Sequence, residues 1–568
     1  MAMQSWRLAF NDVGGVAERN PEESYQSDLF RLTTPEMIGR IRIANERRES
    51  FLLRSSESLE LQFPKVQRSS MAGTVSQSAA LLGSCPEGTE GTKRIGTLAL
   101  RITRGSLTYA LANVGIKALN FCLVPLYTRF LSPADYGIVS LAETIAAGLA
   151  VVLSLGLDAG VGRFYFQYKG DSAKLSRYVS SCLRFSAIWT VLAVGLFLLL
   201  GPRLQGWWAP HFSVPFYPYI AMAIATAALL QIIQYRLSLY QVRERPRAYG
   251  LLTLAVFLAT AAGVVVLVVF AHWGAFGMLL GKLWGAAIAA IAAIYLLRNW
   301  LGSGLEWKFV RETLPFSLPL VPHNLMALCL VVADRFILQH YRGLNEVGLY
   351  SLAYTLGMAM FLVSLSLGQA WQPIYFDTAR GKGARPLLGK LTSTMALLLT
   401  AIAIFGVQIG PYFTRLLDAR YLPIGRLIPW IIGGYLLHAF FGLFQLALLE
   451  SKRTKFIVAA SAAAFGLNLA LNLWWIPRLG MYGAAYATFV AYGAEAILTY
   501  YYAQRVFFLQ YDWRRIFAIL ALFALSLGLS QFGWRAYIHA FMTLGILLTA
   551  AAIVWFSGGQ DRAISFQA

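Results

Sequence analysis

The chain has 568 residues, 58% hydrophobic and 13% charged, with a formal net charge of +21. Soluble domains carry about 25% charged residues, so this composition excludes an ordinary soluble protein and indicates a membrane protein. The basic residues lie mostly in short segments between apolar runs, where membrane topology explains them better than a nucleic-acid partner does. The four cysteines form no CxxC pair or Cys/His cluster. We therefore expect no disulfide framework, no metal site and no cofactor.

Residues 1–95 differ in composition from the rest of the chain. They are polar and rich in Ser, Glu and Arg, and they do not open with a signal-peptide pattern. This composition predicts a disordered cytoplasmic tail. A second interpretation is that translation begins at Met71. The mass of the native N-terminus distinguishes the two.

From about residue 100 onward, apolar runs of about 20 residues follow one another, each long enough to cross a hydrocarbon core of roughly 30 Å as a helix. They predict an all-α polytopic membrane protein with about 14 transmembrane helices. The predicted spans are 106–128, 138–162, 179–201, 216–242, 249–271, 275–297, 313–340, 347–373, 387–414, 425–450, 456–476, 480–503, 514–531 and 535–556.

The charges of the loops orient these spans. Loops after the even-numbered spans hold more than twice as many Lys and Arg residues as the opposite loops. Because cytoplasmic loops carry the excess of basic residues, this pattern places both termini in the cytoplasm. The opposite loops are short, so we expect no catalytic domain outside the membrane.

The sequence repeats itself at a nearly constant offset. GIVSLAET at 137–144 matches GLYSLAYT at 348–355, and LSLG at 153–156 recurs at 365–368. One repeat holds six spans, an even number, so both copies enter the membrane in the same orientation. We expect two parallel six-helix repeats with a substrate path between them. The predicted organisation is a lobe at 100–300, a second lobe at 308–510, two added helices at 511–556 and a cytoplasmic tail at 557–568.

Polar residues inside the first span form one stripe. Tyr109, Asn113, Lys117 and Asn120 share a face of a helix with 3.6 residues per turn. Lys117 lies roughly 16 Å from either end of the span. A charge at that depth usually faces a protein interior or a wet cavity, so we expect Lys117 to line a cavity. The alternative is a lysine that extends to the membrane surface.

Other spans also contain charged or helix-breaking residues. Glu143 and Asp158 lie in the second span, where each either lines the path or is solvated near a loop. Lys282 and Glu495, in spans 6 and 12, either line the path or form structural pairs. Span 7 contains three prolines, which predict a bending element, and after them the polar residues Asn324, Asp334 and Arg335.

No motif for soluble-type catalysis is present. The chain lacks the GxxxxGK[ST], HExxH, GxSxG and DxD patterns that carry nucleotide, zinc, acyl-transfer or sugar-nucleotide chemistry. We therefore expect no enzyme activity and no ATPase within this chain. Any driving force comes from ion or substrate gradients.

Three segments carry a family resemblance: LVPLYTRFLSPADYGIVSLAET, LPFSLPLVPHNLMALCLVVADRFIL followed by NEVGLYSLAYTLG, and GQAWQPIYF at 368–376. Over residues 105–505 the chain resembles the polysaccharide transporter (Wzx-type) flippases of the multidrug/oligosaccharidyl-lipid/polysaccharide exporter superfamily. The leading 95 residues have no counterpart in that pattern. The motifs identify the family well and the cargo poorly.

The resemblance implies a flippase that moves an undecaprenyl-pyrophosphate-linked oligosaccharide across the bacterial inner membrane for cell-surface polysaccharide synthesis. It implies a V-shaped transporter whose two lobes rock around a central cavity, with membrane lipids, a polysaccharide polymerase and a chain-length regulator as further partners. The residues then have expected roles. Cationic contacts are Lys117, Lys282 and Arg335; hydrogen-bonding residues are Asn113, Asn120 and Asn324; ion-coupling candidates are Glu143, Asp158, Asp334 and Glu495.

Four alternatives remain at the level of sequence. A drug or cation antiporter of the same superfamily needs a pocket dominated by carboxylates, whereas basic residues are at least as frequent in the buried set here. A lipid II flippase also moves a pyrophosphate, and the sequence does not distinguish this alternative from an oligosaccharide flippase. A major-facilitator transporter should carry a DRxGRR-like loop, which LDAGVGRFYF only loosely resembles. A membrane polymerase or ligase would need a long periplasmic loop.

Overall fold

The computed structural model describes residues 115–208, 212–300, 304–379, 381, 383–531 and 545–546. Every regular element in these ranges is helical, which confirms the all-α prediction for this part of the chain. The predicted tails at 1–95 and 557–568 lie outside the described residues, as does Asn113.

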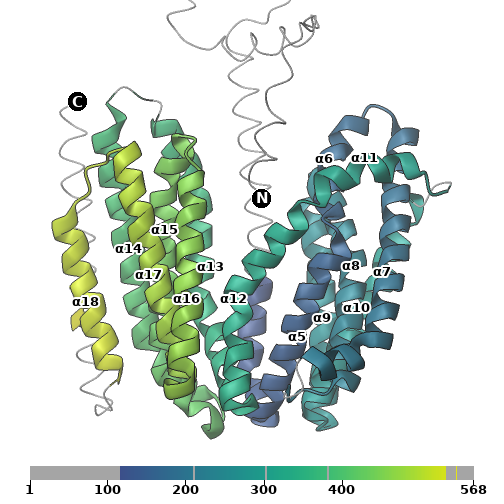
Figure 1. Ribbon diagram of the computed structural model, residues 1–568, viewed down its shortest axis with the longest axis horizontal. Helices are drawn as coiled ribbons and strands as arrows, with labels where there is room; N and C mark the ends of the chain where they lie inside the picture. The colour runs from purple at the N-terminus through teal and green to yellow at the C-terminus, as the bar shows by residue number, and fades with distance from the viewer. Residues whose placement is uncertain are drawn as a thin grey trace, which may run out of the picture. The chain divides into compact units, whose positions relative to one another are not determined.

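The first half of the described chain forms one helical bundle (Figure 1). It begins with the helical residues 115–130. The following elements are α5 (Pro133–Ser154), α6 (Leu157–Tyr168), α7 (Ser172–Trp208), η1 (Phe216–Ile220), α8 (Ala221–Val242), α9 (Pro246–Val265), η2 (Val266–Phe270), α10 (Gly274–Leu297) and η3 (Arg298–Trp300).

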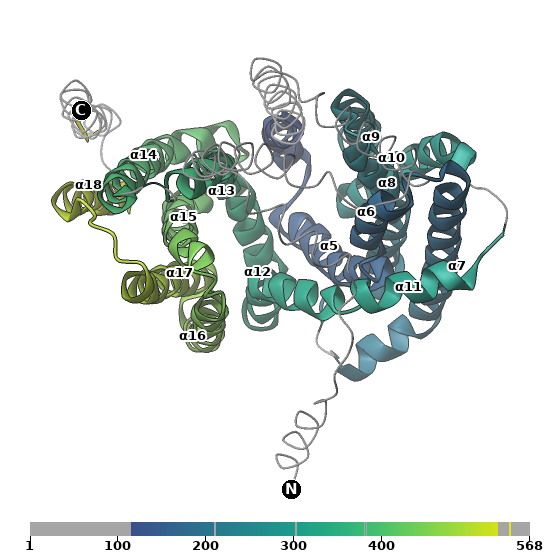
Figure 2. The same ribbon diagram turned by 90° about the horizontal axis from the view of Figure 1, so that it is seen from above.

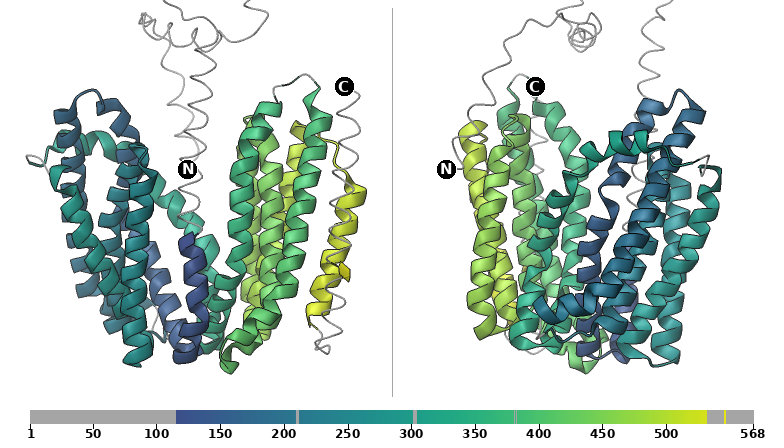
Figure 3. Two further views of the ribbon diagram at one scale, coloured as in Figure 1. Left: turned by 180° about the vertical axis from the view of Figure 1, so that it is seen from behind. Right: turned by 45° about the vertical axis from the view of Figure 1, so that its right-hand side comes forward.

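The second half forms another bundle, which α11 and α12 join to the first (Figure 2). The views in Figure 3 show the same grouping from behind and from the side. α11 (Trp307–Ser317) packs on α6 and α7 of the first bundle and leads into α12 (Leu320–Arg342). The elements that follow are α13 (Leu344–Ala379), α14 (Ala384–Phe413), η4 (Thr414–Leu416), η5 (Ala419–Arg426), α15 (Ile428–Glu450), α16 (Lys455–Leu479), α17 (Met481–Val506) and α18 (Trp513–Gln531).

The helices are long and apolar enough for a membrane protein. In the described residues, 10 helices pass a test of length and hydropathy for spanning a bilayer, or up to 11 with one bent pair. Each predicted span from 138–162 to 514–531 coincides with described helices. The first span is described only from residue 115, and of the last only 545–546 are described. The total of about 14 spans therefore stays a prediction.

Two predicted spans are not single straight helices. The helix expected at 138–162 ends at Ser154, because Leu155 and Gly156 both adopt left-handed backbone angles, with φ of 46° and 67°. The span expected at 313–340 is divided between α11 and α12. Within α12, the segments Leu320–Met326 and Val331–Arg342 meet at 49°. The predicted bend is confirmed, but it lies beyond the prolines.

The start of α5 follows from its local sequence. Ser132 accepts a hydrogen bond from the backbone N–H of Asp135, whose carboxylate accepts one from the Ser132 N–H in return. This reciprocal cap satisfies backbone donors that the first helical turn leaves free. Pro133 follows at the first helical position, where its fixed φ suits the helix. The cap fixes where α5 begins, and with it the contact with α13.

α5 and α13 cross at two glycines. A Cβ atom on Gly137 would overlap the carbonyl of Leu344, and one on Gly348 would overlap the carbonyl of Pro133. One turn further along, the Ser140 hydroxyl donates to the Ser351 hydroxyl at 2.7 Å. The two bundles therefore meet through backbone surfaces near the beginnings of these helices. The same end carries the hydrogen bond from the Tyr421 hydroxyl to the Leu131 carbonyl, at 3.0 Å.

Candidate functional site

The structure brings together two residues that the sequence proposed for different roles. Lys282 on α10 forms an ion pair with Glu143 on α5. The Lys282 side chain is 24% exposed and that of Glu143 is 44% exposed. An unpaired charge in the apolar part of a membrane is costly, so pairing explains how both residues are tolerated there.

This ion pair lines a cavity of about 430 Å³ within the first bundle, here called the Glu143–Lys282 cavity. Its walls come from α5, α8, α9 and α10. Small side chains leave the space open, and polar side chains give it hydrogen-bonding capacity. The polar residues beside the pair are Thr226, Gln231, Gln234 and Thr260.

Arg335 extends this charged region toward α12. Its Nη1 donates to the Thr144 hydroxyl at 3.3 Å, while its buried Nε has no hydrogen-bond partner in the described part of the chain. Tyr136 lies within electrostatic range of Arg335, Lys282 and Glu143. Lys282, Glu143 and Arg335 thus all influence Tyr136, and Arg335 also interacts electrostatically with the buried Asp334.

Asp334 does not form an ion pair with Arg335. It is buried and accepts a hydrogen bond from the Tyr350 hydroxyl of α13, whereas Arg335 points to α5. Its other carboxylate oxygen, Oδ1, lacks a partner among the described residues. Asp334 therefore stabilises the contact between α12 and α13 and lies apart from the Glu143–Lys282 cavity.

Glu495 belongs to a separate polar cluster in the second bundle. Ser461 of α16 donates to Glu495 Oε1 at 2.7 Å, and His438 Nδ1 of α15 lies 3.2 Å from Oε2. The reasoning from sequence missed His438. A lone imidazole within the apolar run 428–450 was the available signal. The cluster joins three helices, α15, α16 and α17, and it therefore stabilises their packing in the second bundle.

The remaining predicted residues lie elsewhere. Lys117 and Asn120 are exposed, and Asn120 Nδ2 donates to the Ile116 carbonyl of its own helix at 3.2 Å. Asn324 is exposed on α12. Asp158 lies in the first turn of α6, where a carboxylate favours the helix N-terminus. None of these four residues lines the Glu143–Lys282 cavity.

Comparison with known proteins shows which sequences this chain is similar to. Residues 102–379 match the family described as polysaccharide biosynthesis protein. The Lsg locus protein 1 of Haemophilus influenzae is 20% identical over 50% of this chain and 68% of its own. A Shigella flexneri protein that is named, provisionally, as an O-antigen transporter is 20% identical over 68% of this chain and 92% of its own.

A solved structure shares the fold. The lipid II flippase MurJ, in an inward closed conformation, superposes with a TM-score of 0.59 at 13% sequence identity, over 79% of this chain and 99% of that one. At this identity the likeness concerns the fold alone. Together with the helices that can span a membrane, these matches indicate a multi-pass membrane transporter, not an enzyme, that is similar over residues 102–379 to the polysaccharide biosynthesis protein family.

Proposed function

We propose that this protein transfers a lipid-linked oligosaccharide with an acidic phosphate head across a bacterial inner membrane, from the cytoplasmic to the periplasmic leaflet. The family match and the O-antigen transporter support a role in the export of a surface polysaccharide. The loop charges support an orientation with both termini in the cytoplasm. A polymerase and a chain-length regulator are the expected partners after transfer.

The observation that carries the substrate class is the Glu143–Lys282 ion pair with Arg335 nearby. A phosphate that leaves the headgroup layer loses its hydration, and fixed cations in a medium of low dielectric constant offset that loss. An entering phosphate competes with Glu143 for the Lys282 ammonium. Glu143, released from Lys282, is then the candidate residue for coupling anion binding to an ion gradient.

The proposed mechanism is alternating access, in which the central cavity opens to one side of the membrane at a time. Pairs of contacts whose residues are separated by the repeat offset support it. Ser140 and Ser351, which bond to each other, are 211 positions apart. Asp135 accepts from the N–H of Ala275 at the start of α10, and Glu346 accepts from the N–H of Met481 at the start of α17. Two parallel repeats would produce such equivalent contacts. We infer that the lobes rock relative to each other and that the α5–α13 contact opens and closes as they do.

The test is export in a bacterial strain that lacks its own glycan flippase. Wild-type protein should restore surface glycan, Lys282→Arg should retain export, and Lys282→Ala should reduce it by about tenfold, as expected for a loss of roughly 1.4 kcal/mol. The exposed Lys308 of α11 provides a matched control, Lys308→Ala, which should export normally. Immunoblots of membranes establish equal protein levels.

Two results would refute the assignment. Full export by Lys282→Ala at a normal protein level would remove the proposed cation from the substrate site. Rescue of a strain depleted of its lipid II flippase, without rescue of the glycan strain, would assign lipid II as the cargo instead.

A further inference from the structure

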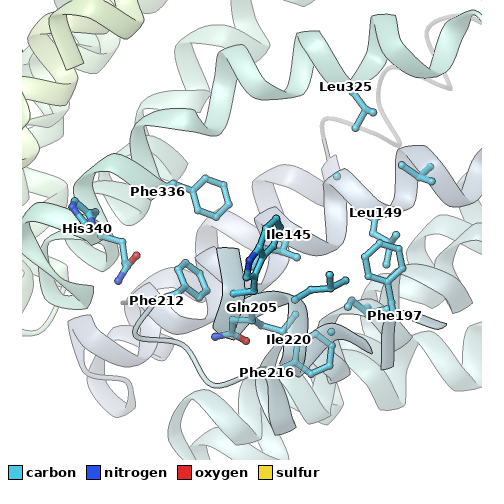
Figure 4. A pocket seen from close by; sticks show the side chains of 17 residues that line it. Ile145, Leu149, Phe197, Gln205, Phe212, Phe216, Ile220, Leu325, Phe336 and His340 are labelled. Atoms are coloured by element: carbon cyan, nitrogen blue, oxygen red, sulfur yellow. The ribbon is translucent and has the colours of Figure 1, made fainter. Parts of the chain in front are cut away.

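A second, larger cavity lies on the other side of α5. It encloses about 750 Å³ between α5, α7, η1 and α12 and is here called the apolar pocket (Figure 4). Aromatic and branched aliphatic side chains line most of it. Its volume falls within the range of about 300 to 1,000 Å³ that small-molecule sites occupy. The pocket is therefore large enough for part of a lipid.

The polar groups of this pocket gather at one end. Gln205 Nε2 donates to the Val214 carbonyl at 2.8 Å, and Gln339 Nε2 donates to the Ser213 hydroxyl at 3.0 Å. Both glutamines therefore hold the same loop, at Ser213 and Val214. Gln205 Oε1 is buried and has no hydrogen-bond partner within the described ranges. It is an acceptor available to a hydroxyl group at this end of the pocket.

From the glutamine end the pocket continues as hydrocarbon. Phe212 and Phe336 lie near His340, whereas Leu149, Phe197 and Leu325 line the part far from His340 (Figure 4). The loop that contains Ser213 is one that the basic residues assign to the periplasm. A lipid in the periplasmic leaflet is arranged in the same direction. Its polar head lies at the membrane surface and its apolar chain points toward the midplane.

α5 forms a wall of both cavities. Ile145, Gly148 and Leu149 face the apolar pocket, whereas Ala146 and Ala147 line the Glu143–Lys282 cavity. A helix with its side chains is only about 10 to 12 Å across. The two cavities are therefore separated by about the thickness of one helix, and the cargo moves past α5 when its chain enters the apolar pocket.

We propose that the apolar pocket binds the isoprenoid chain of the lipid-linked cargo on the leaflet that receives it; this rests on the proposed function. A chain that moves from the bilayer into the pocket gains little hydrophobic energy, because lipid tails are as apolar as the pocket walls. Selectivity must then come from packing against the aromatic walls. A branched isoprenoid chain and a straight acyl chain differ in shape, and they therefore make different van der Waals contacts with these walls.

Gly148 offers a substitution that fills the pocket without disturbing the fold. A Cβ atom built on it meets only one atom within 4 Å, Leu328 Cδ2 at 3.8 Å. Gly148→Leu therefore places a side chain in the pocket. Gly195 of α7 is exposed, and a Cβ there meets nothing within 4 Å, so Gly195→Leu is the matched control outside the pocket.

The experiment uses the purified full-length protein in nanodiscs with a polyprenyl phosphate that carries a photoreactive group at the end of its chain. We expect labelled peptides from α5, α7 and α12, about tenfold less labelling in Gly148→Leu, and normal labelling in Gly195→Leu. Unlabelled polyprenyl phosphate should compete, and phosphatidylglycerol should not. Thermal unfolding of both variants shows that they remain folded.

Several outcomes would overturn the proposal. These are labels confined to other helices in the wild-type protein, equal labelling of both glycine variants, or equal competition by phosphatidylglycerol, which would make the pocket a general lipid site. The export assay separates this inference from the proposed function. If the wild type restores export but the labels lie outside the apolar pocket, only the proposed binding site for the isoprenoid chain is refuted. If the wild type does not restore export, the proposed transport function is refuted.

Discussion

At the scale of residues, the main result is that Glu143 and Lys282 form a pair. The sequence identified both as charges inside apolar runs, because a charged side chain stands out against a membrane helix. It did not predict that they meet, because 139 positions separate them and helix periodicity describes only one helix at a time. The same limit hid His438, whose significance comes from Glu495 on another helix.

The pair makes a prediction about stability. Removing one partner leaves the other charge uncompensated, so Lys282→Met and Glu143→Gln should each lower the unfolding temperature more than the double variant does. Since both side chains are partly exposed, the coupling energy should be about 1 kcal/mol. Thermal unfolding in detergent of the wild type, the single variants and the double variant measures it. Additive effects of the two substitutions would contradict the pairing.

Asp418, in the segment between α14 and α15, provides a prediction about pH. The Arg420 side chain donates to Asp418 Oδ1 at 2.7 Å and holds the pKa of this carboxyl below its usual range. A lowered pKa stabilises the folded state above the unfolded pKa of about 3.9, and this contribution disappears as the pH falls through the folded pKa.

Asp418→Asn should therefore speed hydrogen exchange of the Arg420 amide at neutral pH, since Asp418 Oδ1 accepts from that amide. The difference should vanish at a pH below the folded pKa. Both side chains are partly exposed, so we expect a local effect without global unfolding. Equal exchange in both proteins at neutral pH would show that the carboxylate does not hold this turn.

At the scale of elements, the sequence predicted which helices exist better than where they break. Long apolar runs determine spans directly, because each must satisfy its own backbone within the membrane. No comparable sequence signal marks the break after Ser154. Leu155 has a φ of 46°, but it is an ordinary apolar residue within a run whose pattern predicts a helix. Contacts with α11 explain the break: a Cβ on Gly156 would meet the Ser317 carbonyl at 2.6 Å.

The crossing of α5 and α13 can be tested through its glycines. Gly348→Ala should destabilise the protein by about 1 to 3 kcal/mol, as overpacking commonly does, because its methyl group would overlap the Pro133 carbonyl. Gly368 lies in the same helix with nothing within 4 Å of its Cβ position. Gly368→Ala should leave thermal unfolding unchanged or slightly raise its midpoint. Equal stability of both variants would mean that the helices do not approach so closely.

At the scale of the whole molecule, the two bundles differ in charge at equivalent places. At the offsets of the proposed repeats, 211 and 206 positions, Glu143 and Lys282 correspond to the neutral residues Tyr354 and Thr488. The sequence predicts that Lys117 lines the cavity together with Lys282, but Lys117 is exposed. Only the packing of α5 against α10 shows that Lys282 occupies a cavity.

The central claim is that a lipid-linked oligosaccharide crosses the membrane when the α5–α13 contact opens. Because the Ser140 and Ser351 hydroxyls are 2.7 Å apart, cysteines at both positions can form a disulfide. The measurement is flipping of a fluorescent polyprenyl-diphosphate oligosaccharide in proteoliposomes containing Ser140→Cys/Ser351→Cys in a background without the natural cysteines. We predict transfer by the reduced protein, arrest on oxidation and recovery with reductant. Unchanged transfer by the cross-linked protein, or none by the reduced protein, would contradict the account.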